Sequence, residues 1–203
     1  MNTLLIAATE SEIGPFLKLP EQQDSETEVL VTGVGMVATA FALGKKLATA
    51  RYDLLLNVGI AGSFDRSIPL GDVVCIYQDT FAELGAEDGD DFLDSDQLGL
   101  GQHTFEGISQ GYQALNSLPK CRSITVNKVH GNAAAIAETV RRLKPQMESM
   151  EGAAVFYAAH QAGIPAIQVR AISNYVERRN KASWEIPRAI ENLNGWLRAF
   201  FNP

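Results

Sequence analysis

The chain has few of the residues that form cross-links or bind metals: 203 residues include two cysteines and three histidines. Cys75 and Cys121 both lie in apolar, strand-like stretches, which is typical of buried thiols in a reducing compartment and not of a disulfide framework. His103, His130 and His160 share no spacing that is typical of metal ligands. The sequence therefore predicts no metal site, and it indicates no cofactor.

Basic residues and long apolar runs are also scarce. The 17 lysines and arginines are outnumbered by 24 acidic residues, and the net charge of −7 argues against nucleic acid as the main partner. No apolar run is long enough to cross a bilayer, and the short one at the N-terminus lacks a positive leader and ends at Glu10. We therefore expect a cytoplasmic protein that binds neither nucleic acid nor membrane and whose partner is a small molecule.

Strand-like and helix-like segments alternate along the chain. Strands are expected at residues 3–8, 27–32, 53–58, 73–77, 124–129 and 166–172, and helices at 36–50, 133–143, 151–162 and 184–200. This alternation predicts one α/β domain over residues 1–203, with a mixed, mostly parallel sheet flanked by helices on both faces. The acidic, glycine-rich stretch from 78 to about 120 is the least regular part, and we expect it to form a functional loop or an interface.

Two short patterns imitate familiar motifs. Gly33 to Ala38 matches G-x-G-x-x-A, but the next strand ends at Asn57 and offers no acid for a dinucleotide ribose. Its glycines indicate a close turn at a helix start, suited to a polar ligand and not to a nicotinamide cofactor. Gly107 to Gly111 matches the nucleophile elbow G-x-S-x-G, but no strong strand precedes it, so we attribute the match to chance.

The acidic residues 86–96 raise the question of calcium. Starting a calcium loop at Asp94 places Leu98 where a ligand belongs and the glutamate one position late. A solvated acidic loop is the better interpretation, and the sequence alone assigns it no role.

Polar segments follow three of the expected strands. Ala7 to Glu12 follows the first strand, a turn from Asn57 to Gly62 follows the middle one, and Ser173-Asn174 follows the last. Met150-Glu151 stands at the start of a helix. Because open α/β sheets bind ligands at the carboxyl ends of their strands, we expect these segments to line one pocket.

Together these segments resemble the nucleoside phosphorylase and nucleosidase superfamily over almost the whole chain. The matching stretches, in order, are Ala8-Thr9-Glu10-Ser11-Glu12, Asn57-Val58-Gly59-Ile60-Ala61-Gly62, Met150-Glu151-Gly152-Ala153-Ala154 and Val169-Arg170-Ala171-Ile172-Ser173-Asn174. Each motif alone is weak, but four in the right order are strong. The resemblance implies a three-layer sandwich fold and cleavage of the N-glycosidic bond of a nucleoside.

The resemblance also implies roles for individual residues. Glu12 matches the carboxylate that polarises the attacking water, and Asn174 the group that meets the imidazole edge of the purine. Glu151 matches the carboxylate that accepts hydrogen bonds from the ribose hydroxyls, with Met150 packed beneath the sugar. Further substrate contacts are expected from Ile60, Ala61, Gly62, Phe81, Ser173 and Trp184, and Tyr175, Arg178 and Arg179 are candidates for holding a 5′ extension.

Two departures from the superfamily pattern narrow the interpretation. Methylthioadenosine/S-adenosylhomocysteine nucleosidases carry Asp where this chain has Asn174; a neutral amide offers a donor and an acceptor, which suits O6 and N7–H of a 6-oxopurine. The loop from Thr32 to Ala38 has no arginine for phosphate, and Ile60 replaces a hydroxyl residue. Both observations favour a hydrolase for a 6-oxopurine nucleoside.

Within the superfamily, residues 81–89 and 171–177 resemble the futalosine hydrolase family of menaquinone biosynthesis. This resemblance implies release of hypoxanthine from futalosine, an inosine-like nucleoside with a carboxyphenyl ketone at its 5′ end, leaving dehypoxanthine futalosine. The alternatives are a methylthioadenosine/S-adenosylhomocysteine nucleosidase, a purine nucleoside phosphorylase, or a catalytically silent nucleoside-binding protein. Because the superfamily usually assembles, we expect a homo-oligomer, with a dimer favoured and residues 79–105 as the contact.

Overall fold

A mixed sheet forms the centre of the computed structural model, which describes residues 1–19 and 27–202. Its strands lie in the order β10 (Ala166–Tyr175), β4 (Val73–Phe81), β8 (Lys120–Thr125), β9 (Met147–Ser149), β3 (Leu54–Ser63), β1 (Thr3–Ala7) and β2 (Thr27–Val31). β7 (Thr104–Glu106) pairs with β4, while β5 (Gly85–Asp88) and β6 (Asp91–Asp94) form a separate hairpin. Because β10 also pairs with β3, the strands β3, β10, β4, β8 and β9 form a closed circuit.

Most of the ladders in this sheet are parallel. β1 pairs in parallel with β2 and β3, β3 with β10, and β8 with both β4 and β9, whereas the pairings of β4 with β10, β4 with β7 and β3 with β9 are antiparallel. All five residues of β1 and nine of the ten in β3 are buried, as expected of strands covered on both faces. The predicted mixed, mostly parallel α/β sheet is confirmed.

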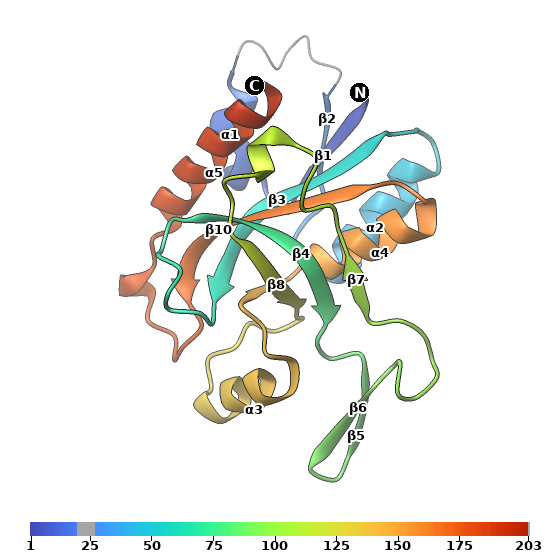
Figure 1. Ribbon diagram of the computed structural model, residues 1–203, viewed down its shortest axis with the longest axis vertical. Coiled ribbons are helices and arrows are strands. Elements are labelled where there is room, and N and C mark those ends of the chain that lie inside the picture. Colours follow the sequence, from blue (N-terminus) through green and yellow to red (C-terminus); the bar gives the residue numbers. More distant parts are fainter. Residues whose placement is uncertain (20–26, 203) are drawn as a thin grey trace.

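Helices cover both faces of the sheet (Figure 1). α2 (Met36–Leu47) and α4 (Gly152–Ala162) contribute Leu43 and Phe156 to the core on one face. α1 (Glu10–Leu17) and α5 (Ile186–Phe201) contribute Phe16 and Leu193 to the core on the other. α3 (Ala133–Leu143) packs through Leu143 on a small separate cluster beside β8. Two short 3-10 helices span Gln113–Leu115 and Lys181–Ser183. Within residues 1–19 and 27–202, no helix has both the length and the apolar character needed to cross a membrane.

Three local predictions were wrong. The turn expected from Asn57 to Gly62 is part of β3, which runs on to Ser63. The strand expected at 124–129 is β8 and lies at Lys120–Thr125. Exposed and buried residues alternate in its first half, so the strand begins before the apolar run that marked it in the sequence. Residues 78–120 are not one loop, since β4 extends to Phe81 and the stretch also contains β5, β6 and β7.

Candidate active site

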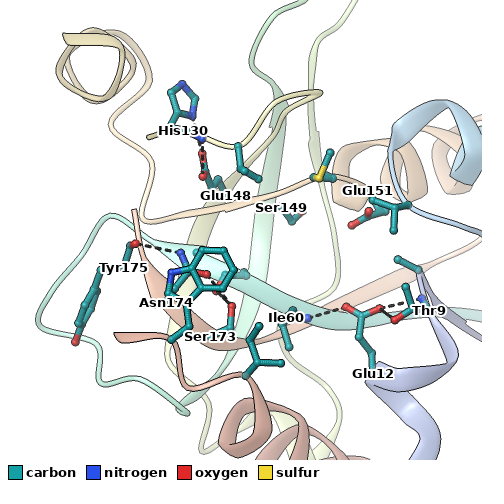
Figure 2. Close-up of a pocket in the computed structure, with 18 of the residues that line it drawn as sticks. Thr9, Glu12, Ile60, His130, Glu148, Ser149, Glu151, Ser173, Asn174 and Tyr175 are labelled. Carbon is teal, nitrogen blue, oxygen red and sulfur yellow. Dashed lines mark hydrogen bonds and ion pairs between the residues drawn. The ribbon is translucent and has the colours of Figure 1, made fainter. Parts of the chain in front are cut away.

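One cavity of about 550 Å³ opens where the carboxyl ends of β1, β3 and β10 meet, and these three strands are mutually parallel. Nine of the ten predicted site residues line it: Glu12, Ile60, Ala61, Gly62, Met150, Glu151, Ser173, Asn174 and Trp184. Figure 2 shows Glu12 and Glu151 at one end of this cavity and Glu148 and Asn174 at the other. The prediction that the polar segments line one pocket at the carboxyl edge of the sheet is thus confirmed.

Phe81, the tenth predicted site residue, lies elsewhere. It lines a second cavity of about 570 Å³, and its ring contacts those of Phe105 and Tyr157, with centroids 6.1 Å and 6.4 Å away. The reason is strand direction: β4 runs antiparallel to β10, so its carboxyl end, where Phe81 stands, points away from Asn174. The placement of Phe81 in the nucleoside pocket was therefore wrong.

Glu12 is held by backbone geometry at the start of α1. Thr9 is the N-cap residue, and Glu12 Oε2 accepts hydrogen bonds from its backbone N–H at 2.9 Å and its hydroxyl at 3.0 Å. Glu12 Oε1 accepts a third bond, of 3.1 Å, from the backbone N–H of Ile60. The side chain is 8% exposed. Two carboxylate oxygens offer about four acceptor positions, so three fixed donors leave one for a water molecule in the cavity.

A buried arginine stands beside this carboxylate, and the sequence did not single it out as a site residue. Arg170 is 1% exposed and donates from Nη2 to Asn57 Oδ1 at 2.6 Å. A Cβ atom at Gly59 would lie 2.4 Å from Arg170 Nη1 and 2.8 Å from Glu12 Oε1. Gly59 is thus a strand glycine whose missing side chain makes room for both groups, and it brings a positive charge close to Glu12.

Glu151 is anchored by the glycine loop that precedes α2. The backbone N–H of Gly35, a residue with a φ of 97°, donates to Glu151 Oε1 at 2.9 Å. The predicted polar ligand of this loop is therefore a carboxylate of the protein itself. Since only one acceptor position of Glu151 is used in this bond, the carboxylate retains capacity for ribose hydroxyls.

A β-bulge directs Ser173 and Asn174 into the cavity. In the β3–β10 ladder Ile172 pairs with Ala61 and Asn174 with Gly62, so Ser173 is the extra residue. The Ser173 hydroxyl lies 2.9 Å from Asn174 Oδ1 and 3.2 Å from the carbonyl oxygen of Ala61, while Asn174 Nδ2 donates to the carbonyl oxygen of Tyr175 at 3.0 Å. The bond to Tyr175 fixes which way the amide faces, and it leaves one N–H and one lone pair for a ligand.

A further carboxylate, which was not predicted from the sequence, lines the cavity at the Asn174 end. Glu148 is 3% exposed, and its oxygens face the backbone N–H and Nδ1 of His130, at 3.0 Å and 2.6 Å. The other ring nitrogen of His130 lies 2.9 Å from Thr139 Oγ1. Burial raises the pKa of Glu148, and the hydrogen bond from His130 opposes that rise.

The mouth of the cavity carries a cation and an aromatic ring. The guanidinium of Arg179 lies over the indole of Trp184, with 5.0 Å between the guanidinium carbon and the ring centroid, and both residues line the cavity. Tyr175 lines it as well, whereas Arg178, the other arginine considered from sequence, does not.

One acidic cluster lies outside both cavities. His103, at the start of the segment that leads into β7, has Nδ1 2.5 Å from Asp96 Oδ2 and Nε2 3.7 Å from Asp94 Oδ2. Sequence spacing did not reveal this grouping, because the chain folds back between Asp96 and His103. Asp96 is exposed and the other two side chains are partly buried, so the cluster lies at the surface of the molecule.

Known proteins resemble this chain in sequence and in fold. The profile of the phosphorylase superfamily matches residues 24–202. The futalosine hydrolase of Streptomyces coelicolor is 34% identical over 185 residues, which make up 87% of this chain and 77% of that protein. The futalosine hydrolase of Thermus thermophilus is 28% identical over 171 residues, or 81% of this chain and 76% of its own length.

Solved structures share the fold at lower identity. A methylthioadenosine/S-adenosylhomocysteine nucleosidase from Colwellia psychrerythraea, in complex with adenine, superposes with a TM-score of 0.81 at 19% identity, covering 100% of this chain and 95% of that one. Futalosine hydrolase from Helicobacter pylori superposes with a TM-score of 0.81 at 16% identity, covering 98% and 97%. The profile matches residues 24–202, and a relative is 34% identical over 87% of this chain. The chain therefore belongs to the phosphorylase superfamily.

Proposed function

We propose that this chain is a futalosine hydrolase, which cleaves the N-glycosidic bond of futalosine with water and releases hypoxanthine and dehypoxanthine futalosine. The observation that carries the proposal is the polarity of the cavity at the strand ends: two carboxylates, Glu12 and Glu151, stand at one end and the amide of Asn174 at the other. The name shared by relatives at 28–34% identity supports the same assignment.

The carboxylate end suits the chemistry at the sugar. Glu12 accepts a proton from a water whose oxygen bonds to C1′ as the C1′–N9 bond breaks. The purine leaves with the bonding electrons and takes up a proton, so neutral hypoxanthine and the C1′ hydroxyl are the products. The sugar passes through an oxocarbenium-like state, which the negative charges of Glu12 and Glu151 stabilise. Met150 also lines the cavity, and we assign it to the apolar floor of the sugar site. At the other end, Asn174 donates to the developing charge on the purine O6.

Water is favoured over phosphate as the nucleophile. A phosphate would use backbone N–H groups at the start of α2, but the N–H of Gly35 is already bonded to Glu151. The loop from Thr32 to Ala38 also carries no basic side chain. Glu12 faces the place that an anionic nucleophile would have to occupy, and it would repel phosphate.

The 5′ extension of the substrate is assigned to the cavity mouth. Trp184 offers an aromatic face for the phenyl ring, and Arg179 offers a guanidinium for its carboxylate. Both residues lie in the connection between β10, which carries Asn174, and α5. One continuous segment therefore contacts both the base and the 5′ extension of the substrate.

We further propose that the enzyme is a cytoplasmic homodimer. Its two cysteines are free and buried, which suits a reducing compartment. The second cavity lies in an apolar face formed by Val37, Leu84, Leu100 and Tyr157, whose side chains are 44–78% exposed. Leu84 and Leu100 lie in the expected contact region, residues 79–105. Val34, which lines the nucleoside cavity, is three residues from Val37, so a second copy on this face would adjoin the active site.

The deciding experiment incubates purified protein with futalosine, with methylthioadenosine and with inosine, each with and without phosphate, and measures free base. The proposal expects phosphate-independent release of hypoxanthine from futalosine with much the highest kcat/KM. Faster release of adenine from methylthioadenosine would instead identify a nucleosidase of that type. Phosphate-dependent cleavage would identify a phosphorylase. Absence of turnover with every substrate would indicate a catalytically silent nucleoside-binding protein.

A further inference from the structure

Glu148 and Asn174 stand on either side of Gly62. In the ladders of β3, Gly62 pairs with Glu148 of β9 on one side and with Asn174 of β10 on the other. Paired residues on neighbouring strands point to the same face of a sheet, and two strand spacings separate the outer pair by about 10 Å. A Cβ atom at Gly62 would lie 3.0 Å from Val176 Cγ2, 3.3 Å from Asn174 Nδ2 and 3.5 Å from Glu148 Cγ. The missing side chain thus lets Glu148, Asn174 and Val176 pack closely around Gly62, with the carboxylate on one side of it and the amide on the other, and Gly62, Glu148 and Asn174 all line the cavity.

The contacts of Glu148 fix it as an acceptor. When the Thr139 hydroxyl donates to His130 Nε2, the proton of the imidazole must lie on Nδ1, which then donates to Glu148 Oε2. Glu148 Oε1 accepts the backbone N–H of the same histidine. Each carboxylate oxygen therefore has one protein donor and retains one acceptor position, and both residues line the cavity.

The two purine classes present opposite groups to such an acceptor. A 6-oxopurine has a donor at N1–H next to the acceptor O6, whereas a 6-aminopurine has an acceptor at N1 next to a donor amino group. Along the edge of a 6-oxopurine the order is N7, O6 and N1–H. Asn174 and Glu148, in this order across Gly62, present an amide and then a carboxylate.

We propose that Glu148 is a specificity residue: its carboxylate accepts N1–H of the 6-oxopurine while Asn174 contacts O6 and N7. His130 and Thr139 act as positioning residues that hold Glu148 as an acceptor. The inference rests on the proposed function and adds to it the group that rejects a 6-aminopurine, whose N1 lone pair would face the carboxylate unpaired. Sites that hydrogen-bond a donor of the substrate reject analogues lacking it by up to about 10⁴-fold.

The test measures binding of free bases, so it does not depend on turnover. Calorimetry compares hypoxanthine, 1-methylhypoxanthine and adenine on the wild-type protein, on Glu148→Gln and on the control Glu138→Gln. The control removes an exposed carboxylate of α3 that pairs with Arg141 and does not line the cavity. Thermal melting establishes that each variant is folded.

We expect the wild-type protein to bind hypoxanthine at least about tenfold more tightly than 1-methylhypoxanthine or adenine. Glu148→Gln should bring the hypoxanthine-to-adenine ratio to within about threefold of unity, because the amide can donate to N1 of adenine. Glu138→Gln should behave as wild type. Equal affinities for hypoxanthine and 1-methylhypoxanthine in the wild type, or ratios unchanged in a folded Glu148→Gln, would overturn the proposal.

The positioning role has its own test. Thr139→Val removes the hydroxyl that lies 2.9 Å from His130 Nε2, so the imidazole loses the partner that, as a donor, would favour a proton on Nδ1. The hypoxanthine-to-adenine ratio should fall several-fold in Thr139→Val, and Thr139→Ser, which restores the hydroxyl, should restore the ratio. An unchanged ratio in a folded Thr139→Val, or a lowered ratio that Thr139→Ser does not restore, would overturn this role.

Failure of the proposed function would look different. If futalosine is not hydrolysed but the base ratios behave as expected, the enzyme assignment is wrong and the role of Glu148 stands. If futalosine is hydrolysed and Glu148→Gln leaves the ratios unchanged, the assignment stands and the role of Glu148 is wrong.

Discussion

The backbone N–H of Ile60 donates to the side chain of Glu12 at 3.1 Å, although the two residues are 48 positions apart. One carboxylate therefore joins the start of α1 to β3, and it does so at the cavity. Thr9 supplies the other two donors, which makes Glu12 both the capping acid of its helix and the proposed water-binding group. These two roles predict two separate effects of substitution.

Glu12→Gln should lower kcat for futalosine by about 10²- to 10⁴-fold and change KM by no more than a few-fold. The amide loses the charge that polarises water. It also places an N–H group against either Thr9 or Ile60, so the free energy of unfolding should fall by about 1–3 kcal/mol. Steady-state kinetics and denaturant titration measure the two effects.

Glu10→Gln is the matched control, because Glu10 lies exposed in the same helical turn and does not line the cavity. It should leave kcat and stability near their wild-type values. Full activity of Glu12→Gln would remove Glu12 from the mechanism.

Asn174→Asp should shift the base preference from inosine-type toward adenosine-type substrates. The carboxyl group would place an oxygen 3.0 Å from the carbonyl oxygen of Tyr175, where the amide now donates, and this repulsion raises the pKa of the new acid. The variant should therefore keep a proton at acidic pH and lose activity as the pH rises. The ratio of kcat/KM for the two substrates, measured across pH, tests this; an unchanged ratio would contradict it.

The strand pattern and the main site residues could be predicted because they rest on local signals. Buried parallel strands appear as unbroken apolar runs, and polar residues at their ends mark a ligand edge. The glycines of residues 59–62 were misread as a turn because glycine signals either a turn or a close approach. At Gly59 and Gly62 the approaching groups, Arg170 and Asn174, come from another strand.

Other features depend on contacts that no local pattern records. In the sequence, nothing distinguishes Glu148 from other acidic residues, and its partner His130 lies 18 residues earlier. They meet because β9 and the segment after β8 lie side by side, and β9 is too short to give a strand signal. Phe81 was misplaced for a similar reason, since the antiparallel direction of β4 is set by the sheet and not by its own sequence.

Arg179→Met should raise KM for futalosine about tenfold and leave the KM for inosine unchanged, because inosine has no carboxylate for the guanidinium. Arg178→Met is the control, since Arg178 does not line the cavity. Equal effects of Arg179→Met on both substrates would show that Arg179 supports the segment and does not bind the extension.

Val37→Glu should convert the proposed dimer into monomers. Val37 is 77% exposed in the apolar face, and a buried, unpaired carboxylate at a subunit contact costs several kcal/mol. The control Val140→Glu places the same charge on α3, away from this face. Sedimentation analysis should give dimers for wild type and the control; a monomeric wild type would contradict the prediction.

Asp79 is a buried acid that should make stability depend on pH. It is 0% exposed, and it accepts hydrogen bonds of 2.9 Å from Thr125 Oγ1 and from Gln168 Nε2. Burial raises its pKa to about 6, from a usual 3.8, although both hydrogen bonds oppose the rise. Gln168 Oε1, close to Asp79 beneath Gly152, has no donor among the described residues, and a protonated Asp79 could supply one after rotation of the amide.

Between pH 3.8 and about 6 the folded protein holds a proton on Asp79 that the unfolded chain has released. The stability that Asp79 contributes is therefore complete below the unfolded pKa and is lost as the pH rises through the folded one. The raised pKa corresponds to a decrease in the free energy of unfolding on the order of 3 kcal/mol over this pH range. Asp79→Asn, neutral at all pH values, should remove this part of the slope and be more stable than wild type at pH 7. Denaturant titrations at pH 4, 5, 6 and 7 measure it, and parallel slopes for the two proteins would contradict the raised pKa.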